Sequence, residues 1–280
     1  MDINSYITKF KEVAQVQNLP ASQVKKYLSY AKNLLELDLP VIYDQEHFSH
    51  LVGYDYSFIL ALSNASDSFY RKFEIPKRNG KSRMIDEPYP TLKEIQLWIL
   101  NSILTPASRH FVSPVAKAFM PGKSLLDNAK FHRKKECVVA LDIHDFFGSI
   151  HLGAVYGVFK AMGYSSSVST LLSKLCTLNN SLPQGAPTSP MLSNMVFKRT
   201  DDGIFSYCCK RGIMYTRYAD DFLISSFFIP VRPLNTEPSA IPAPRYPPPI
   251  PPPRPPNTAI QPAIFGWGAS LASRASWPAA

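Results

Sequence analysis

The chain has 280 residues, 45% of them hydrophobic and 12% aromatic, which is enough to bury a sizeable core in one large domain or two smaller ones. Lys and Arg number 30 against 21 Asp and Glu, and the net charge of +9 favours a polyanionic partner such as nucleic acid, although an ordinary basic soluble protein has the same balance. The four cysteines lack C-x-x-C spacing and are not grouped with histidines, which argues against a zinc site. Without an apolar leader or a run of about 18 apolar residues, we expect a cytoplasmic protein with no membrane contact.

Near the N-terminus, apolar residues recur at helical spacing over residues 5–37, which predicts a helical region. Two short apolar runs then flank residues 77–81. The Asn79-Gly80 pair between them is typical of a hairpin turn, because both positions tolerate positive φ. The tip of this hairpin carries three cations.

The central part of the chain contains both helical and strand patterns. A helix is predicted through residues 92–104, and the β-branched run Cys137–Leu141 is short enough to be a buried strand that ends at Asp142. Further helices are predicted near residues 152–162, 166–178 and 190–210, with a loop over 179–188. In the last of these helices, Asp201 and Asp202 are expected on a solvated face.

A second hairpin is predicted where Ile213–Arg217 and Phe222–Ser226 flank Tyr218-Ala219-Asp220-Asp221. If the strand that ends at Asp142 lies beside this hairpin, three carboxylates meet at one edge of a sheet. Carboxylates are the ligands that Mg²⁺ prefers, and nucleotidyl transfer uses two such ions about 3.5 to 4 Å apart. Taken alone, an Asp-Asp turn is more often a solvated turn than a metal site.

After Phe228 the composition changes abruptly, because this stretch holds 15 of the 26 prolines and its only acidic residue is Glu237. Proline neither donates to a sheet nor continues a helix, so a polyproline II or disordered tail is predicted. One interpretation is a frame change or insertion in the coding sequence. The other is a polyproline arm around Arg254 that docks into an aromatic groove on a partner.

Three segments, Leu141–Phe147, Leu182–Pro190 and Tyr218–Asp221, resemble the palm motifs of reverse transcriptases and occur in that family's order. The resemblance implies an α+β right-hand polymerase with fingers and palm. It divides the chain into the following regions: a helical N-terminal region (1–70), fingers (71–135), a palm (136–228) and a Pro-rich tail (229–280). The family's V-T-G element and helical thumb are missing from the pattern after the palm.

The resemblance also implies roles for individual residues. Asp142, Asp220 and Asp221 are the expected catalytic residues and the ligands of two Mg²⁺ ions. Phe147 matches the bulky residue that excludes a ribose 2′-hydroxyl, so the incoming substrate is expected to be a deoxynucleoside triphosphate.

Four more residues are expected to bind that nucleotide. Gln184 and Gly185 match a loop that lies against it, and Lys81 and Arg83 match cations that contact its triphosphate. The alternatives are a plain loop before a helix for Gln184-Gly185 and a solvated turn for Lys77 and Arg78 in the hairpin.

Residues 128–132, Asn-Ala-Lys-Phe-His, resemble the N-A-x-x-H element of retron reverse transcriptases. By that resemblance Asn128 and His132 take part in RNA recognition. The expected partners are a structured noncoding RNA that serves as template and primer, its single-stranded DNA product, and an effector protein in antiphage defence. The alternative for the element is a helix end with a capping asparagine and a surface histidine.

Two rival functions are also compatible with the sequence. One is another bacterial reverse transcriptase, of the group II intron or abortive-infection type, against which the N-A-x-x-H element argues. The other is a catalytically silent, truncated remnant that only binds RNA, which the missing thumb favours.

Overall fold

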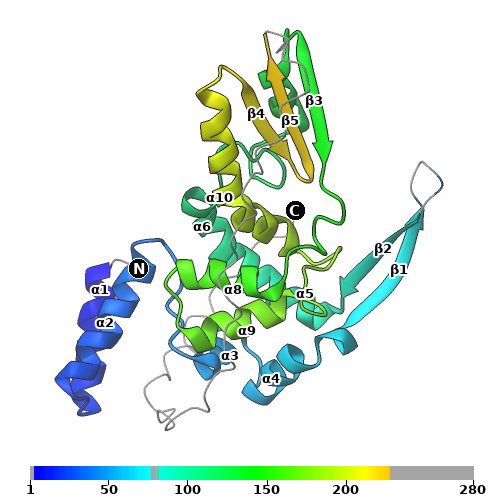
Figure 1. Cartoon of the computed structure of the whole chain (residues 1–280). Helices are drawn as coiled ribbons and strands as arrows, with labels where there is room; N and C mark the ends of the chain where they lie inside the picture. The colour runs from blue at the N-terminus through cyan, green and yellow to red at the C-terminus, as the bar shows by residue number, and fades with distance from the viewer. Residues whose placement is uncertain (1–2, 77–79, 81, 228–280) are drawn as a thin grey trace.

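The computed structural model describes residues 3–76, 80 and 82–227, which form a helical body, a projecting two-stranded hairpin and a lobe built on a three-stranded sheet (Figure 1). The described helices are α1 (Ile3–Val16), α2 (Ala21–Leu35), α3 (Gln45–Val52), α4 (Tyr56–Asn64), the 3-10 helix η1 (Ser66–Phe69), α5 (Pro90–Ile99), the π-helix η2 (Leu100–Leu104), α6 (Thr105–Phe111), α7 (Leu125–His132), α8 (Leu152–Ala161), α9 (Ser166–Cys176) and α10 (Ser189–Cys209). The described strands are β1 (Tyr70–Pro76), β2 (Ser82–Pro88), β3 (Cys137–Asp142), β4 (Met214–Tyr218) and β5 (Asp221–Ser226). This mixture of helix and sheet confirms the predicted α+β class. The predicted tail over 229–280 and the turn residues 77–79 and 81 lie outside the described residues.

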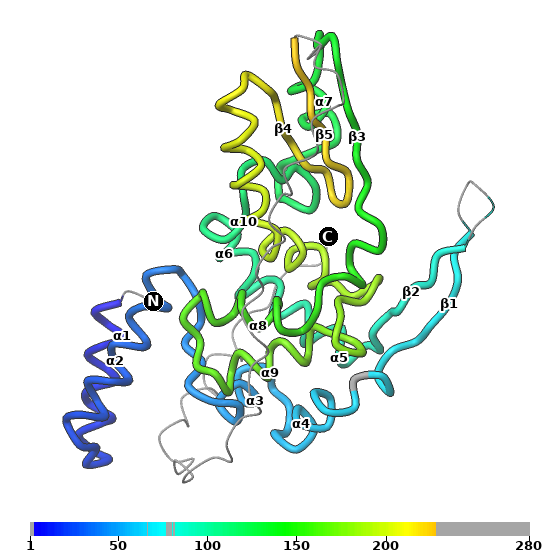
Figure 2. The backbone as a smooth tube through the Cα atoms, in the orientation of Figure 1, coloured from blue at the N-terminus to red at the C-terminus, as the bar shows by residue number. Residues whose placement is uncertain are grey.

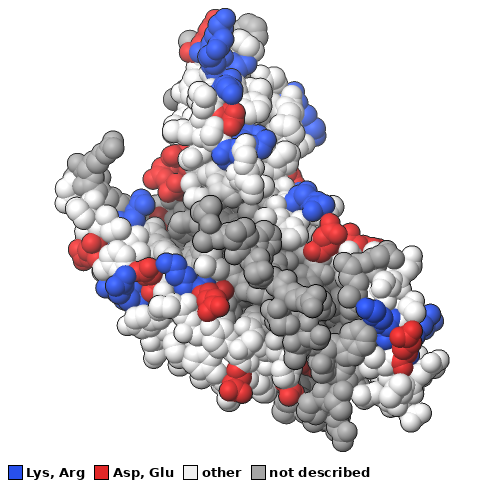
Figure 3. Space-filling model, turned by 180° about the vertical axis from the view of Figure 1, so that it is seen from behind, with Lys and Arg blue, Asp and Glu red and all other residues white. Residues whose placement is uncertain are grey.

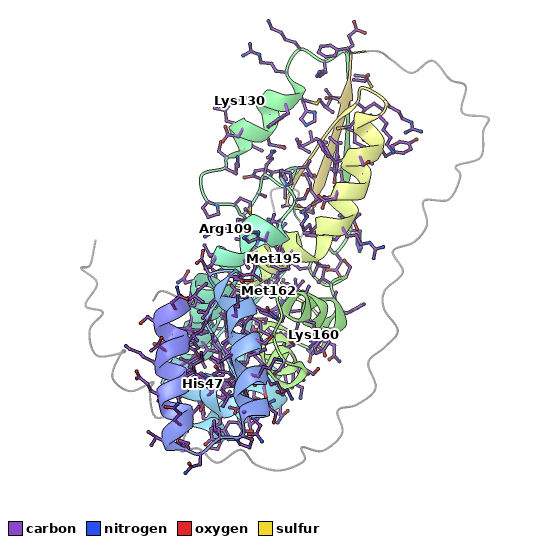
Figure 4. The ribbon with its side chains drawn as sticks, turned by 90° about the vertical axis from the view of Figure 1, so that its left-hand side faces the viewer. His47, Arg109, Lys130, Lys160, Met162 and Met195 are labelled. Atoms are coloured by element: carbon purple, nitrogen blue, oxygen red, sulfur yellow. The ribbon has the colours of Figure 1, made fainter. Side chains whose placement is uncertain are left out.

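The helical body is built around one large apolar core. Fully buried side chains from α3, α5, α8, α9 and α10 belong to it, among them Phe48, Phe159 and Leu192. Met162, at the end of α8, and Met195, on α10, both lie in this core and are labelled in Figure 4. Ala31 and Leu34 of α2 belong to the same core, and Tyr6 of α1 packs against it, so the predicted N-terminal helical region packs onto the helical body.

The hairpin of β1 and β2 extends from the body toward solvent (Figure 1). Its strands pair antiparallel, with Ile75 opposite Arg83, as the flanking apolar runs predicted. Most residues of β1 are exposed, and β2 becomes buried only at its end near Pro88. The base of the hairpin is held by a hydrogen bond from the Asp86 backbone N–H to the Gln184 carbonyl oxygen, at 2.7 Å.

The second sheet has the strand order β3-β5-β4, and both pairs of strands are antiparallel. Helix α7 contacts β4 and β5, and α10 contacts β4 (Figure 2). On the other edge of β4, the Arg217 backbone N–H donates to the Val115 carbonyl oxygen, and the Lys117 N–H donates to the Arg217 carbonyl oxygen. Strand β4 is thus enclosed on its faces and on both edges.

Strand β3 corrects one prediction. We expected a buried strand, but Val138, Val139 and Leu141 have exposed fractions of 50%, 44% and 51%. Within the described residues β3 pairs only with β5, so it is an edge strand. A short β-branched run predicts a strand but does not distinguish an edge from the centre of a sheet.

Among the described helices, none is both long and apolar enough to cross a membrane.

Candidate active site

Three carboxylates come together at one end of the three-stranded sheet. Asp142, the last residue of β3, lies opposite Asp221, the first residue of β5. The Ile143 backbone N–H donates to the Asp220 carbonyl oxygen at 3.1 Å, which ties the segment after β3 to the hairpin turn. The prediction that the strand and the hairpin are neighbours is therefore confirmed, although the two segments are far apart in the sequence.

The turn between β4 and β5 has only two loop residues, Ala219 and Asp220, because Tyr218 pairs with Asp221. Ala219 has a φ of 59°, in the left-handed region that favours glycine. Non-glycine residues in this region persist where the surrounding structure holds them, and they cluster at functional sites.

The carboxylates influence one another electrostatically. The pKa of Asp221 is raised, first by partial burial and then by the negative charges of Asp220 and Asp142. A divalent cation would relieve this repulsion, and carboxylate oxygens are the donors that a hard cation such as Mg²⁺ prefers. In the described ranges, no group of three or more His, Cys, Asp or Glu side chains is already arranged to hold a metal ion. The fit to a metal therefore rests on the shared sheet edge and the donor chemistry.

A fully buried ion pair lies directly behind the turn. Arg217, on β4, donates through Nε and Nη2 to Asp201 of α10, with distances of 2.9 Å to Oδ1 and 2.7 Å to Oδ2. Both side chains have an exposed fraction of 0%. The Tyr215 hydroxyl also donates to Asp201 Oδ1, at 2.8 Å. The prediction that Asp201 lies on a solvated face is therefore wrong, whereas Asp202 is half-exposed and pairs with Lys198.

The sequence does contain a signal for this pair. Phe197, Asp201, Ile204 and Cys208 recur at helical spacing, so Asp201 occupies a position within an apolar stripe of α10. A carboxylate in such a stripe is buried only with a partner. Arg217 supplies it from β4, where it shares one face with Tyr215 by the two-residue period of a strand.

The N-A-x-x-H element forms a second buried polar network, on the α7 side of the sheet. The Thr216 hydroxyl donates to Asn128 Oδ1 at 2.6 Å. His132 lies between Thr216 Oγ1 and Ser225 Oγ, each 2.7 Å from one of its ring nitrogens. The alternative of a capping asparagine and a surface histidine is wrong, because both side chains are buried and Ser124 caps α7. In this arrangement the two side chains join α7 to β4 and β5, and RNA recognition by them stays a prediction.

The hydrogen bonds define the protonation of His132. Because Thr216 uses its only proton to reach Asn128, it must accept from His132 Nε2–H. Burial, followed by the positive charge of Lys135, lowers the pKa of His132. The neutral ring then accepts a hydrogen bond from Ser225 at Nδ1.

The loop that contains Gln184 and Gly185 packs against β2. Gly185 has a φ of 130°, and a Cβ at this position would lie 2.6 Å from the Asp86 carbonyl oxygen. The glycine thus permits a close backbone approach, and the described partner of that approach is Asp86; contact of this loop with a nucleotide stays a prediction. The loop connects the base of the exposed hairpin to the helix that supports the sheet.

The remaining predicted nucleotide-binding residues lie in three different settings. Arg83 is exposed on β2, and Lys81 lies outside the described residues. Phe147 is half-buried between Phe146 and Phe119, whose ring centroids are 5.6 Å and 6.4 Å away. The described residues thus give Phe147 a packed position and leave Arg83 accessible.

The end of the sheet opposite the carboxylates is basic. The connection from α7 to β3 carries Arg133, Lys134 and Lys135 beside one acidic residue, Glu136, and Lys and Arg side chains gather at this end of the lobe (Figure 3). Such a concentration of positive charge favours contact with a nucleic-acid backbone.

Residues 75–228 match the family described as reverse transcriptase (RNA-dependent DNA polymerase), which is more than half of the chain. The chain belongs to the reverse transcriptase family. The retron Ec86 reverse transcriptase of Escherichia coli is 36% identical over 195 residues, which cover 69% of this chain and 60% of that protein. The retron Mx162 reverse transcriptase of Myxococcus xanthus is 36% identical over 174 residues, and the match covers 56% of this chain and 35% of that protein. The retron Ec83 reverse transcriptase of Escherichia coli is 32% identical over 179 residues, and the match covers 60% of this chain and 56% of that protein.

These similarities confirm the resemblance to retron reverse transcriptases. The chain spans between 35% and 60% of the length of these three relatives.

Proposed function

We propose that this chain carries the catalytic centre of a retron-type reverse transcriptase, an RNA-directed DNA polymerase that makes single-stranded DNA. The observation that carries the proposal is the pairing of Asp142 with Asp221 beside the Ala219-Asp220 turn. This pairing falls within the segment that matches the reverse transcriptase family. We interpret the β1–β2 hairpin as part of the fingers and the three-stranded sheet as the palm.

In this proposal Asp142, Asp220 and Asp221 hold two Mg²⁺ ions. When bound, the ions supply the positive charge that activates a primer 3′-hydroxyl and stabilises the leaving pyrophosphate. The protein's own contribution is to present the three carboxylates together, Asp142 and Asp221 from two paired strands and Asp220 from the turn. Partial burial raises the pKa of Asp221 most, and the negative charges of Asp220 and Asp142 raise it further; this repulsion supports a cation as the partner of this edge.

The incoming deoxynucleotide would lie between this edge and the hairpin. Arg83 and Lys81 would contact its triphosphate, for which the planar guanidinium of Arg83 is suited to bidentate contact. Gln184 and Gly185 would line its base or sugar. Phe147 would exclude a 2′-hydroxyl, and its packing against two other phenylalanine rings supports a fixed position for that role.

The template and primer would be a structured noncoding RNA, and the product would be DNA joined to it. The names of the relatives as retron reverse transcriptases support this choice. The basic end of the sheet lobe supports contact with a polyanion. We also propose a role in antiphage defence together with an effector protein, on the basis of the similarity to retron reverse transcriptases.

The direct test is incorporation of labelled deoxynucleotide on a primed RNA template with Mg²⁺. We expect incorporation by the wild-type chain, dependence on Mg²⁺, and loss in an Asp220→Asn/Asp221→Asn variant that still binds the RNA. Replacing Phe147 by Ala should allow ribonucleotides to be incorporated. RNA binding without incorporation by the wild-type chain would favour the rival function, a protein that holds RNA without copying it.

A further inference from the structure

The turn that carries Asp220 requires support from the rest of the protein. Ala219 adopts a φ of 59°, which is unfavourable for a residue with a Cβ. Alanine has no polar side-chain atom with which to stabilise this conformation locally. The hydrogen bond from Ile143 to the Asp220 carbonyl oxygen holds the turn only from the β3 side.

Arg217 supplies the second support. Its Nη1 donates to the Ala219 carbonyl oxygen at 2.8 Å, which fixes the orientation of the peptide group between Ala219 and Asp220. The same guanidinium is bound by Asp201 through Nε and Nη2. One planar group therefore links α10 to the residue that precedes the two aspartates of the turn.

The surroundings of Arg217 make this link rigid. The guanidinium carbon lies 5.2 Å from the centroid of the Phe197 ring and 5.8 Å from that of Phe146. Both charged side chains are fully buried. A buried ion pair contributes little net stability compared with apolar residues that fill the same space, because desolvation offsets the attraction. Its value is therefore expected to lie in geometry.

We infer that Arg217, anchored by Asp201, is a positioning residue that sets the Ala219-Asp220 turn, and with it the carboxylates of Asp220 and Asp221. This inference rests on the proposed function for its catalytic consequence. The geometric part concerns the turn alone and does not depend on polymerisation.

The test removes the pair without leaving a buried polar group unpaired. In an Asp201→Leu/Tyr215→Phe/Arg217→Met variant, every side chain of the network is replaced by an apolar one of similar size. The matched control is Asp38→Asn/Arg109→Gln, which removes an exposed Asp–Arg pair on the helical body; Figure 4 labels Arg109. Amide hydrogen exchange at Ile143, whose N–H bonds to Asp220, reports the position of the turn in the full chain without nucleic acid.

We expect the triple variant to remain folded and the Ile143 amide to exchange at least about tenfold faster than in the wild type and the control. In nucleotide incorporation, kcat should fall at least about tenfold while KM for deoxynucleotide stays within about twofold, because the change affects the carboxylates and leaves Arg83 untouched.

A second variant, Arg217→Lys, keeps the charge but lacks the fork that reaches Asp201 and Ala219 together. It should show the same local increase in exchange, so the inference remains testable if the triple variant does not fold. Wild-type exchange at Ile143 in either folded variant would overturn the inference. If the wild-type chain incorporates no nucleotide but the exchange difference is present, the proposed function fails and the positioning role stands.

Discussion

The two hairpins of this protein are built in opposite ways. The β1–β2 hairpin extends into solvent, and its side chains form surface ion pairs in which Glu87 contacts Arg71 and Lys93. The β4–β5 hairpin is enclosed by α7 and α10, and its polar side chains bond to buried partners, as in the pair of Arg217 with Asp201. Surface pairs tolerate movement, whereas a buried pair holds one geometry. In the proposed function, the first hairpin is therefore suited to contact a substrate, and the second to keep the aspartates of its turn fixed.

The largest difference between the hairpins should appear when one partner of an ion pair is removed. Arg217→Gln leaves Asp201 buried without its charge partner, and we expect the free energy of unfolding to fall by about 3 to 5 kcal/mol. Arg71→Gln removes an exposed partner of Glu87 and should leave the free energy of unfolding near the wild-type value. Urea unfolding of the two variants measures both values. Equal losses would show that the two hairpins do not differ in this way.

The α7 side of the sheet should respond next most strongly. His132→Ala removes the partner of two buried hydroxyls, those of Thr216 and Ser225, and we expect a loss of about 1 to 3 kcal/mol in the free energy of unfolding. His110→Ala, at an exposed position of α6, is the matched control and should lie within about 0.5 kcal/mol of wild type. A wild-type unfolding midpoint together with weakened RNA binding in His132→Ala would instead favour direct RNA contact by this residue.

Acid should weaken the same network. The folded state lowers the pKa of His132, so on acidification the unfolded chain takes up this proton first. The contribution of neutral His132 is therefore complete above the unfolded pKa of about 6.5 and declines as the pH falls below it. Unfolding measured between pH 7.5 and about 5.5 should show a smaller loss of stability in His132→Gln than in wild type. An unchanged slope in that variant would contradict this assignment.

The exposed hairpin should affect substrate affinity with little effect on stability. Arg83→Gln removes a cation expected to contact the triphosphate, and KM for deoxynucleotide should rise about tenfold with a smaller change in kcat. Arg71→Gln, on the neighbouring strand, provides the comparison. Steady-state incorporation on a primed RNA template measures both constants, and equal KM values for the two variants would remove Arg83 from the nucleotide site.

The smallest effect concerns the repulsion among the carboxylates. The folded state raises the pKa of Asp221, so the charged form of this residue destabilises the fold. This destabilisation is complete above the folded pKa and diminishes as the pH falls toward the lower, unfolded pKa. Asp221→Asn should therefore raise the free energy of unfolding at pH 7, by no more than about 1 kcal/mol because the group is exposed. Thermal unfolding without divalent cations tests this, and a clear destabilisation would mean that Asp221 has a structural role.

The sequence predicted the parts of the site that depend on local chemistry. Turn residues between apolar runs predicted both hairpins, and the resemblance to palm motifs implied that Asp142 would lie beside the turn. Predictions from the sequence were wrong where the outcome depends on tertiary contacts. The edge position of β3 depends on which strands pair in the folded chain. The burial of Asp201 depends on its ion pair with Arg217, which lies on β4, the strand that follows α10. A charged residue in an apolar stripe is the pattern that should have prompted a search for its partner.

The central claim is that Asp142, from a separate strand, completes a catalytic site with the two aspartates of the turn. The most direct measurement is single-nucleotide incorporation on a primed RNA template with Mg²⁺, comparing wild type with Asp142→Asn. We predict a loss of at least about 10³-fold in kcat, with unchanged RNA affinity and unfolding midpoint, because a metal ligand contributes several kcal/mol to transition-state stabilisation. Incorporation by Asp142→Asn within tenfold of an active wild type would contradict the claim.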